Sequence, residues 1–261
     1  MSKPQQVNAF ILRKVDYGDQ DQIITVFGRE SGKFSARARN ARASKKRFGG
    51  GLQPMRRLCL SYTQAANRAM ASLSEIEILQ DYRGLEGSFE KITIASYATE
   101  LVREFVQDAN AEPETFDLLD AFYGELAGFV GSNKSVSESY FLGAMLFQFE
   151  LRLLAIHGAL PSLQGCFRCG VPAAEMDRLR CMRSGEGLIC AACRRPGEAS
   201  GLLSGATFSL LCYLQNPASS APEGLGDPGV HQQIRRLLDA GLEQILTRPL
   251  KSRAMLDALF L

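Results

Sequence analysis

The sequence of 261 residues predicts a multidomain α+β protein with three parts. These are an N-terminal five-stranded OB-like barrel, an α-helical bundle domain and a zinc-binding insert of the four-cysteine type. Three observations predict this class: short apolar and β-branched runs fill the first eighty residues, helical spacing follows them, and two Cys-x2-Cys pairs interrupt the helical part. We expect domains at 1–82, at 83–163 together with 197–261, and at 164–196.

Turn-forming residues separate the five predicted strands of the barrel. The strands are expected at 7–15, 22–27, 33–38, 57–63 and 70–79. A long basic loop ending in Gly49-Gly50-Gly51 lies between the third and fourth strands, and its glycines favour a mobile loop. Five short strands with one long loop fit a small closed barrel of the OB type. An SH3-like barrel would explain the same pattern nearly as well.

Apolar residues recur at helical spacing after residue 83. The predicted helices cover 94–105, a segment that begins at Pro113, 135–157, 205–214 and 234–245. The segment 135–157 is apolar nearly all round, which is typical of a buried central helix. A stretch rich in Pro and Gly, 216–229, predicts a loop or linker, and a short apolar tail ends the chain.

The composition is that of a globular protein, with 46% hydrophobic and 22% charged residues. The most apolar stretch, 141–160, is interrupted by Glu150 and Arg152, so we expect no membrane span. The N-terminus lacks the apolar core and cleavage site of an export signal. Seven cysteines, four of them in close pairs, indicate metal binding in a reducing compartment. We therefore expect a soluble cytoplasmic protein.

The two cysteine pairs are the strongest chemical signal in the sequence. Cys166 and Cys169 form the first pair, and Cys190 and Cys193 form the second. Each pair can present two thiolates to one ion, and four sulfur ligands suit tetrahedral Zn²⁺. Such a site has no open position for a water, so we expect one structural zinc ion per chain. The alternative is four buried or redox-active cysteines, and Cys181 between the pairs is expected to be a spare thiol.

A basic segment, 33–57, contains nine cationic residues and no acidic one, whereas the rest of the chain has 21 Lys and Arg against 28 Asp and Glu. The cations are Lys33, Arg37, Arg39, Arg42, Lys45, Lys46, Arg47, Arg56 and Arg57. In an extended strand the first three share one face. Such a surface suits a polyphosphate backbone, and Phe48 at the end of the loop is the candidate for stacking on a base. The alternative is an ordinary solvated charge run.

Signals for catalysis are weak. The chain has two histidines and lacks a phosphate-binding P-loop, a serine nucleophile elbow and a His-Glu-x-x-His motif. Asp16, Asp19, Asp21 and Glu30 leave a metal-dependent nuclease as a minor alternative, although their spacing favours turns. We expect no catalytic residue and no enzyme activity.

Three stretches of sequence carry a resemblance to a known family. They are Ile11-Leu12-Arg13 with Tyr17-Gly18-Asp19-x-Asp21 and Phe27-x-Arg29-Glu30-x-Gly32-Lys33; Ala38-Arg39-Asn40-Ala41-Arg42 with Arg47-Phe48-Gly49-Gly50 and Leu52-Gln53-Pro54; and Phe149-Glu150-Leu151-Arg152-Leu153-Leu154 with Gly158-x-x-Pro161 and Cys166-x-x-Cys169-Gly170. In this order they resemble the RecO family of bacterial recombination mediators. The chain departs from the family where Arg39-Asn40 replaces a frequent Lys-Gly.

The resemblance implies an OB-fold that binds DNA at 1–82, a helical domain and a zinc module, although some relatives lack the zinc cysteines. It also implies a non-enzymatic role in recombinational DNA repair after damage, at the nucleoid. Such proteins bind single- and double-stranded DNA and anneal complementary strands. They assist RecA loading, together with RecR, on DNA coated by single-stranded-DNA-binding protein.

The resemblance further implies that the C-terminal acidic tail of the single-stranded-DNA-binding protein docks on the helical domain. Three cations on the predicted helices, Arg152, Arg235 and Arg236, are the expected contacts. An RNA-binding accessory protein built from the same barrel and zinc knuckle stays open as the alternative function.

Overall fold

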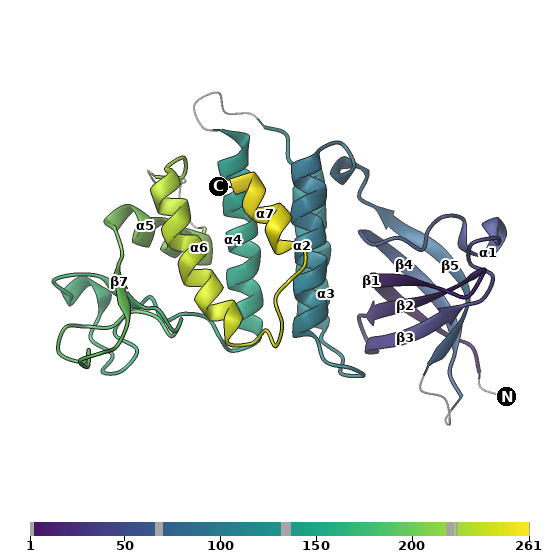
Figure 1. The fold of residues 1–261 in the computed structure, drawn as a ribbon, viewed down its shortest axis with the longest axis horizontal. Helices are drawn as coiled ribbons and strands as arrows, with labels where there is room; N and C mark the ends of the chain where they lie inside the picture. The colour runs from purple at the N-terminus through teal and green to yellow at the C-terminus, as the bar shows by residue number, and fades with distance from the viewer. Residues whose placement is uncertain (1–2, 66–69, 132–136, 218–221, 223, 261) are drawn as a thin grey trace. The chain divides into compact units, whose positions relative to one another are not determined.

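The computed structural model describes residues 3–65, 70–131, 137–217, 222 and 224–260. The chain forms two compact units, one of residues 1–129 with 250–258 and one of residues 130–249 with 259–261. Figure 1 labels helices α1 to α7, strands β1 to β5 and strand β7. The predicted three-domain boundaries follow a different division and stay a prediction.

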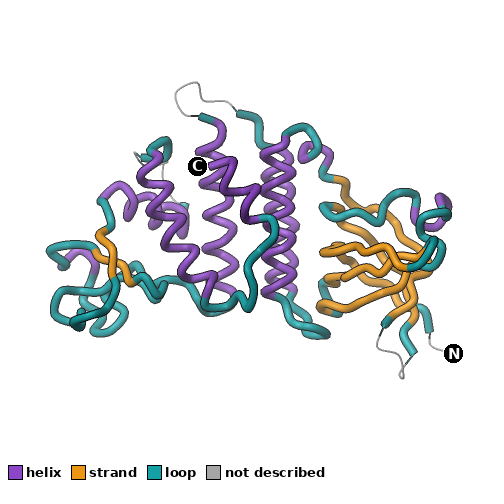
Figure 2. Tube along the Cα trace, viewed as in Figure 1, coloured by secondary structure: helices purple, strands orange, loops and turns teal. Residues whose placement is uncertain are grey.

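The five predicted strands form a closed barrel in the first unit. They are β1 (Gln5–Tyr17), β2 (Asp21–Gly28), β3 (Gly32–Ala38), β4 (Arg56–Thr63) and β5 (Ala71–Asp81). Around the barrel the order is β1-β2-β3-β5-β4, and only β3 and β5 pair in parallel. This is the arrangement of the OB-fold, which confirms the predicted class. Figure 2 shows the strands in orange.

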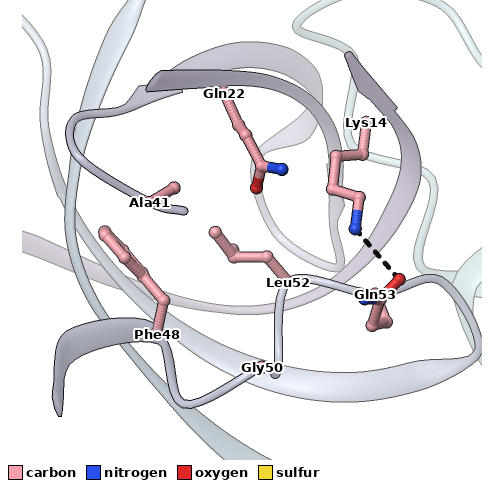
Figure 3. A pocket seen from close by; sticks show the side chains of 7 residues that line it. All are labelled: Lys14, Gln22, Ala41, Phe48, Gly50, Leu52 and Gln53. Carbon is pink, nitrogen blue, oxygen red and sulfur yellow. Dashed lines mark hydrogen bonds between the residues drawn. The ribbon is translucent and has the colours of Figure 1, made fainter. Parts of the chain in front are cut away.

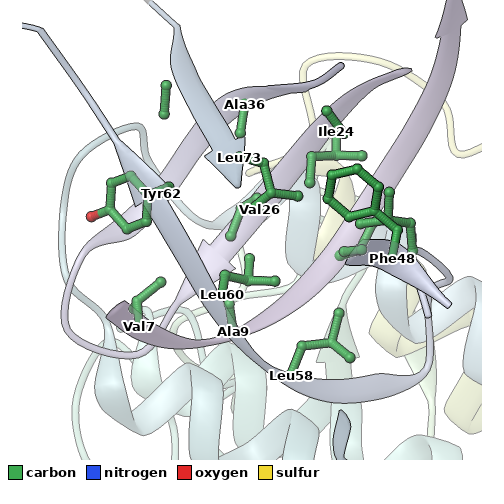
Figure 4. Close-up of a cluster of buried hydrophobic side chains, with 14 residues drawn as sticks. Val7, Ala9, Ile24, Val26, Ala36, Phe48, Leu58, Leu60, Tyr62 and Leu73 are labelled. Carbon is green, nitrogen blue, oxygen red and sulfur yellow. The ribbon is translucent and has the colours of Figure 1, made fainter. Parts of the chain in front are cut away.

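The barrel interior follows from the two-residue alternation of its strands. In β4, for example, Leu58, Leu60 and Tyr62 are buried, while the residues between them are half-buried. A ring from outside the strands completes this core, because Phe48 is only 2% exposed and belongs to the same cluster. Figure 4 shows Phe48 beside Ile24 at one end of the cluster. The expectation that Phe48 stacks on a base is therefore wrong.

A one-turn helix in the loop between β3 and β4 explains the burial of Phe48. This helix is α1 (Lys45–Phe48). The backbone N–H of Phe48, its last residue, donates to the carbonyl of Ser44, the residue before the helix, at 3.4 Å. It ends at Gly49 and Gly50, whose φ angles of 47° and 73° favour glycine. The basic loop therefore contains local structure that turns the aromatic ring inward.

We expect Phe48→Leu to lower the free energy of unfolding by about 1–2 kcal/mol, because it removes part of a filled core side chain. Phe89→Leu is the matched control, since Phe89 is 61% exposed in the same unit and its replacement should change stability by less than about 0.5 kcal/mol. Urea denaturation followed by circular dichroism measures both. Equal stability of the two variants would show that the ring does not fill the barrel core.

Besides α1, the first unit contains α2 (Phe89–Phe105), α3 (Pro113–Gly128) and most of the short α7 (Arg253–Phe260). The hydroxyl of Ser88 caps α2 by accepting from the N–H of Lys91, and Pro113 opens α3 as predicted. The barrel packs against α3 through aromatic rings. The ring centroids of Phe10 and Phe27 lie 4.7 Å and 5.7 Å, respectively, from the ring centroid of Phe116 in α3. A 3-10 turn (Arg83–Leu85) joins the barrel to the helices.

The turn between β2 and β3 is held against the segment that follows α2. Gly32 has a φ of 69°, and a Cβ placed there would lie 2.2 Å from the carbonyl oxygen of Asn110. The N–H of Ala109 donates to the carbonyl of Lys33 at 2.8 Å, next to this approach. Only glycine fits at position 32, which accounts for the Gly32-Lys33 pair in the first family-like stretch.

The second unit contains α4 (Glu138–Ile156), α5 (Gly205–Gln215) and α6 (Pro228–Glu243), with a cysteine-rich module between α4 and α5. The module carries a 3-10 turn (Ala173–Glu175) and the two-stranded sheet of β6 (Arg180–Met182) and β7 (Ser200–Leu202). Helix α4 contacts both α5 and α6, as expected for the central helix. It is long and apolar enough to cross a membrane, but 56% of its most apolar window is buried inside the protein, as in a core helix.

Several predicted boundaries change. The linker expected at 216–229 is shorter at its end, because Asp227 caps α6 by accepting from the N–H of Gly229 at 2.7 Å. Its residues 218–221 and 223 lie outside the described residues, as do the first two residues of the helix expected at 135–157. The apolar tail forms α7.

A candidate nucleic-acid interface and a candidate metal centre

The nine cations of the basic segment do not form one surface, because some of them pair with carboxylates of the protein itself. Lys33 donates through Nζ to the carbonyl of Arg103 at 3.0 Å and lies 3.5 Å from Asp108. Arg57 donates through Nη1 to Asp120 of α3 at 2.6 Å. These two cations join the barrel to α2 and α3.

Arg56 is a third cation with a structural role. Its Nε lies 3.1 Å from Asp81 of β5, and its Nη1 donates to the carbonyl of Gly50 at 3.2 Å. The side chain is 21% exposed. It therefore ties the end of the basic loop to the paired ends of β4 and β5.

The other cations lie at the end of β3 and in the basic loop. Arg39, Arg42 and Lys46 are exposed, which makes their charges available to a polyanion. Arg47 is half-buried, donates through Nη2 to the carbonyl of Arg39 at 2.7 Å and lies 5.0 Å from the ring centroid of Phe48. The side chain of Lys45 lies outside the described residues. We call Arg39, Arg42 and Lys46 the loop-side cations.

Asp21 at the start of β2 organises this end of the barrel. One carboxylate oxygen accepts from Nε of Arg37 at 2.7 Å, and the other accepts from the N–H of Asn40 at 2.8 Å. Asn40 has a φ of 53°, in the left-handed region that asparagine tolerates better than most residues. The bond from Asn40 and then that from Arg37 lower the pKa of Asp21, so it is ionised at neutral pH. This geometry explains how asparagine adopts a left-handed conformation at position 40.

Three of the four acidic residues considered for a nuclease, Asp16, Asp21 and Glu30, make local side-chain contacts. Asp16 accepts from the amide of Gln22 at 2.9 Å, and Glu30 lies 3.5 Å from Arg29. Among the residues that the structure describes, the only group of three or more possible metal ligands is the cysteine cluster. The carboxylates at the start of the barrel are therefore not gathered into a metal-binding site.

A surface pocket of about 140 Å³ lies beside the basic loop (Figure 3). Phe48 and Leu52 form an apolar wall, while Lys14 and Gln53 line another side. Lys14 donates through Nζ to the amide oxygen of Gln53 at 3.0 Å. The pocket places one more cation, from outside the basic segment, close to this loop.

Sequence reasoning missed one aromatic residue at this end of the barrel. Tyr17 ends β1, is 51% exposed, and has the guanidinium of Arg37 5.2 Å from its ring centroid. Its sequence context, beside Asp16 and Gly18, had predicted a turn. The two-residue spacing that places Tyr17 on the same strand face as Arg13 and Val15 is the signal that would have predicted an outward position.

The four predicted metal ligands come together in the second unit. The sulfur atoms of Cys166, Cys169, Cys190 and Cys193 all lie within 4.8 Å of one another, and those of Cys169 and Cys190 are 3.7 Å apart. Zn–S bonds of about 2.3 Å place the sulfurs of a tetrahedral site about 3.8 Å apart. The cluster therefore fits one zinc-sized ion.

Both cysteine pairs sit in tight turns that aim their sulfurs at one point. In the first, the N–H of Gly170 donates to the carbonyl of Cys166 at 2.8 Å, and Gly170 has a φ of 75°. In the second, the N–H of Cys193 donates to the carbonyl of Cys190 at 3.2 Å. Arg168 joins the turns by donating through Nη1 to the carbonyl of Cys193 at 2.6 Å.

The thiols of the cluster influence one another's ionisation. Burial opposes the thiolate of Cys166, but N–H groups of the two turns lower its pKa to about 6. Hydrogen bonds between the thiol of Cys193 and the sulfurs of Cys169 and Cys190, together with burial, raise the pKa of Cys193 to about 12. One thiolate therefore forms easily, and its negative charge opposes the ionisation of a second thiol. A divalent cation bound to both sulfurs would offset this repulsion. Cys181 lies outside the cluster and donates to the carbonyl of Gly187 at 3.2 Å.

The three cations expected to contact a partner differ in their surroundings. Arg152 and Arg236 are exposed. Arg235 instead donates to both carboxylate oxygens of Glu150 at 2.8 Å, and Glu150 is fully buried. Arg235 also pairs with Asp239 at 2.8 Å. Its charge therefore compensates a buried carboxylate between α4 and α6, which removes it from the expected contacts.

Comparison with known proteins identifies relatives of the whole chain. The family model described as Recombination protein O N terminal matches residues 1–82, and that described as Recombination protein O C terminal matches residues 86–254. A protein named DNA repair protein RecO from Anaeromyxobacter dehalogenans strain 2CP-C is 35% identical over 255 residues, which cover 97% of this chain and 95% of the relative. The protein of the same name from Geobacter sulfurreducens is 33% identical, with 98% of each chain covered. That from Myxococcus xanthus is 31% identical, over 94% and 93%.

Proposed function

The chain belongs to the RecO family of DNA repair proteins, and from this membership we propose that it binds DNA at the loop-side cations and anneals complementary strands. RecO proteins are recombination mediators and not catalytic enzymes. The observation that carries the proposal is the exposure of Arg39, Arg42 and Lys46. They belong to the loop that carries α1, which Figure 1 shows at the end of the barrel away from α2 and α3.

Annealing requires little more than a cationic surface. Two single strands repel each other, and a protein that neutralises phosphates on both lowers this barrier without reading the sequence. The loop-side cations supply such a surface. Lys33, Arg37, Arg56 and Arg57, which also belong to the basic segment, are left out because each of them already pairs with a carboxylate of the protein.

We propose that the protein acts in the cytoplasm at the nucleoid, where it helps to load RecA together with RecR on DNA coated by single-stranded-DNA-binding protein. The acidic tail of that protein would dock on the helical domain. Of the three expected cations, Arg152 and Arg236 remain as the proposed contacts, since both are exposed. Salt-sensitive binding of an acidic tail to these side chains follows from their charge.

The metal centre is proposed to hold one structural zinc ion. Cys166, Cys169, Cys190 and Cys193 would bind it, and zinc would supply the cohesion that a module of this size lacks. Four sulfur ligands fill a tetrahedral shell, so the ion would take no part in chemistry on DNA.

We expect the purified protein to accelerate duplex formation between complementary labelled oligonucleotides, with or without Mg²⁺, and to do so on strands coated by single-stranded-DNA-binding protein. Native gel electrophoresis over time measures the rate, and protein-free strands are the control. No acceleration would contradict the proposal. Strand shortening with Mg²⁺ would instead indicate a nuclease, and tighter binding to structured RNA would favour the RNA-binding alternative.

A further inference from the structure

We propose that Tyr17 is a stacking site for one base of single-stranded DNA, and that Arg37 and Asp21 hold the ring in place for it. The proposal rests on the proposed function, because it requires DNA to reach this end of the barrel. Beside the phosphate contacts proposed for the loop-side cations, it assigns the protein a contact with a base.

The position of Tyr17 on the barrel is fixed by strand pairing. Tyr17 is the last residue of β1 and pairs with Asp21, the first residue of β2. Pairs of this kind place both side chains on one face of the sheet. With 51% of its surface exposed, Tyr17 presents a large aromatic surface to solvent on the outer side of the barrel.

Arg37 and Asp21 brace this ring from one side. The guanidinium of Arg37 lies 5.2 Å from the ring centroid of Tyr17, and its Nη2 lies 2.5 Å from the carboxylate of Asp21. Asp21 is itself held by the N–H of Asn40 at 2.8 Å. Because the ring already has Arg37 against it and Arg37 already pairs with Asp21 in the free protein, we expect stacking of a base to cost little additional side-chain entropy.

The same face offers further contacts to a single strand. Val15, two residues before Tyr17, is 43% exposed and pairs with Ile23 of β2. Ile23 in turn pairs with Arg37 of β3. An apolar strip and a cation therefore flank the ring, which suits a base on the ring and a phosphate on the guanidinium.

Stacking of a base on Tyr17 would let the protein distinguish single strands from duplexes. The bases of a duplex are already stacked on each other and paired, so an exposed ring gains nothing from them. Phosphate contacts act on both forms of DNA. Tyr17 would therefore supply a preference for single strands that the loop-side cations do not.

The absence of tryptophan from the chain permits a direct test. Tyr17→Trp places a single tryptophan at the proposed stacking site, and we expect its fluorescence to be quenched when a thymidine oligonucleotide binds. Phe89→Trp is the control, because Phe89 is 61% exposed on α2 and its tryptophan should report no quenching. Both titrations are read together with the anisotropy of a labelled oligonucleotide.

Affinity measurements complete the test. Tyr17→Ala should weaken single-strand binding about 5- to 150-fold with an unchanged salt slope, whereas Tyr17→Phe should stay within about twofold of the parent. On a strand whose bases are removed, Tyr17→Ala should bind like the parent protein. Circular dichroism establishes that each variant is folded.

Two results would overturn the inference while the proposed function stands. One is binding by anisotropy without quenching of the tryptophan at position 17. The other is an equal loss of affinity by Tyr17→Ala for intact and abasic strands. Failure of the parent protein to bind any DNA would instead contradict the proposed function itself.

Discussion

Replacing Arg39, Arg42 and Lys46 together with Ala should weaken binding to every DNA sequence and flatten the dependence of affinity on salt. Each phosphate contact with a single strand contributes about 0.7 to the slope of log affinity against log salt, so three lost contacts remove up to about 2 units. At about 0.1 M salt this corresponds to a loss of affinity of up to about 100-fold. Fluorescence anisotropy over a salt series measures both quantities.

The matched control for this variant removes the same charge elsewhere. Arg83, Arg178 and Arg183 are exposed and lie outside the basic segment, so their joint replacement with Ala should leave the salt slope nearly unchanged. Thermal denaturation of both variants tests that they are folded. If the loop-side variant kept the affinity and salt slope of the parent, this end of the barrel would not be the site of DNA binding.

Loss of the metal ion should unfold the cysteine module. The purified protein should contain about one zinc ion per chain, and Cys166→Ser should release it, because three ligands no longer close the site. Structural zinc contributes about 10–16 kcal/mol in isolated zinc-finger peptides, which exceeds what a module without a large core can replace. Elemental analysis and limited proteolysis of residues 164–196 measure the two effects.

Cys212→Ser is the control for the zinc prediction, because Cys212 lies in α5 outside the cluster and should leave metal content unchanged. The annealing rate of Cys166→Ser should fall only in proportion to the fraction of the protein that is misfolded. Protein prepared without chelator that contained no stoichiometric metal would refute the assignment.

The fold could be predicted from the sequence because its signals are local. Alternating residues such as Leu58 and Leu60 define a strand without knowledge of its partners, and Pro113 marks a helix start wherever the helix packs. The cysteine ligands were predictable for the same reason, since each pair is closed by its own turn. Boundaries such as the start of α6 depended on a cap at Asp227, which the glycine- and proline-rich stretch obscured.

The candidate DNA site was only partly predictable, because the availability of a charge depends on distant residues. Nothing near Arg57 in the sequence indicates that Asp120 neutralises it. The inward turn of Phe48 depends on a one-turn helix too short to leave a periodic pattern. Tyr17 was missed because its contact is with Arg37, twenty residues later and on another strand.

The contacts between the barrel and helices α2 and α3 have a consequence for the design of shorter fragments of the protein. Family resemblance divides the chain near residue 82, yet Phe10 and Phe27 pack on a ring of α3. A fragment that ended at the family boundary would expose these rings to water and leave Arg57 without its carboxylate. Insolubility of that fragment would report the missing helices and not a defect of the barrel, so the smallest autonomous piece should extend to residue 129 and retain residues 250–258.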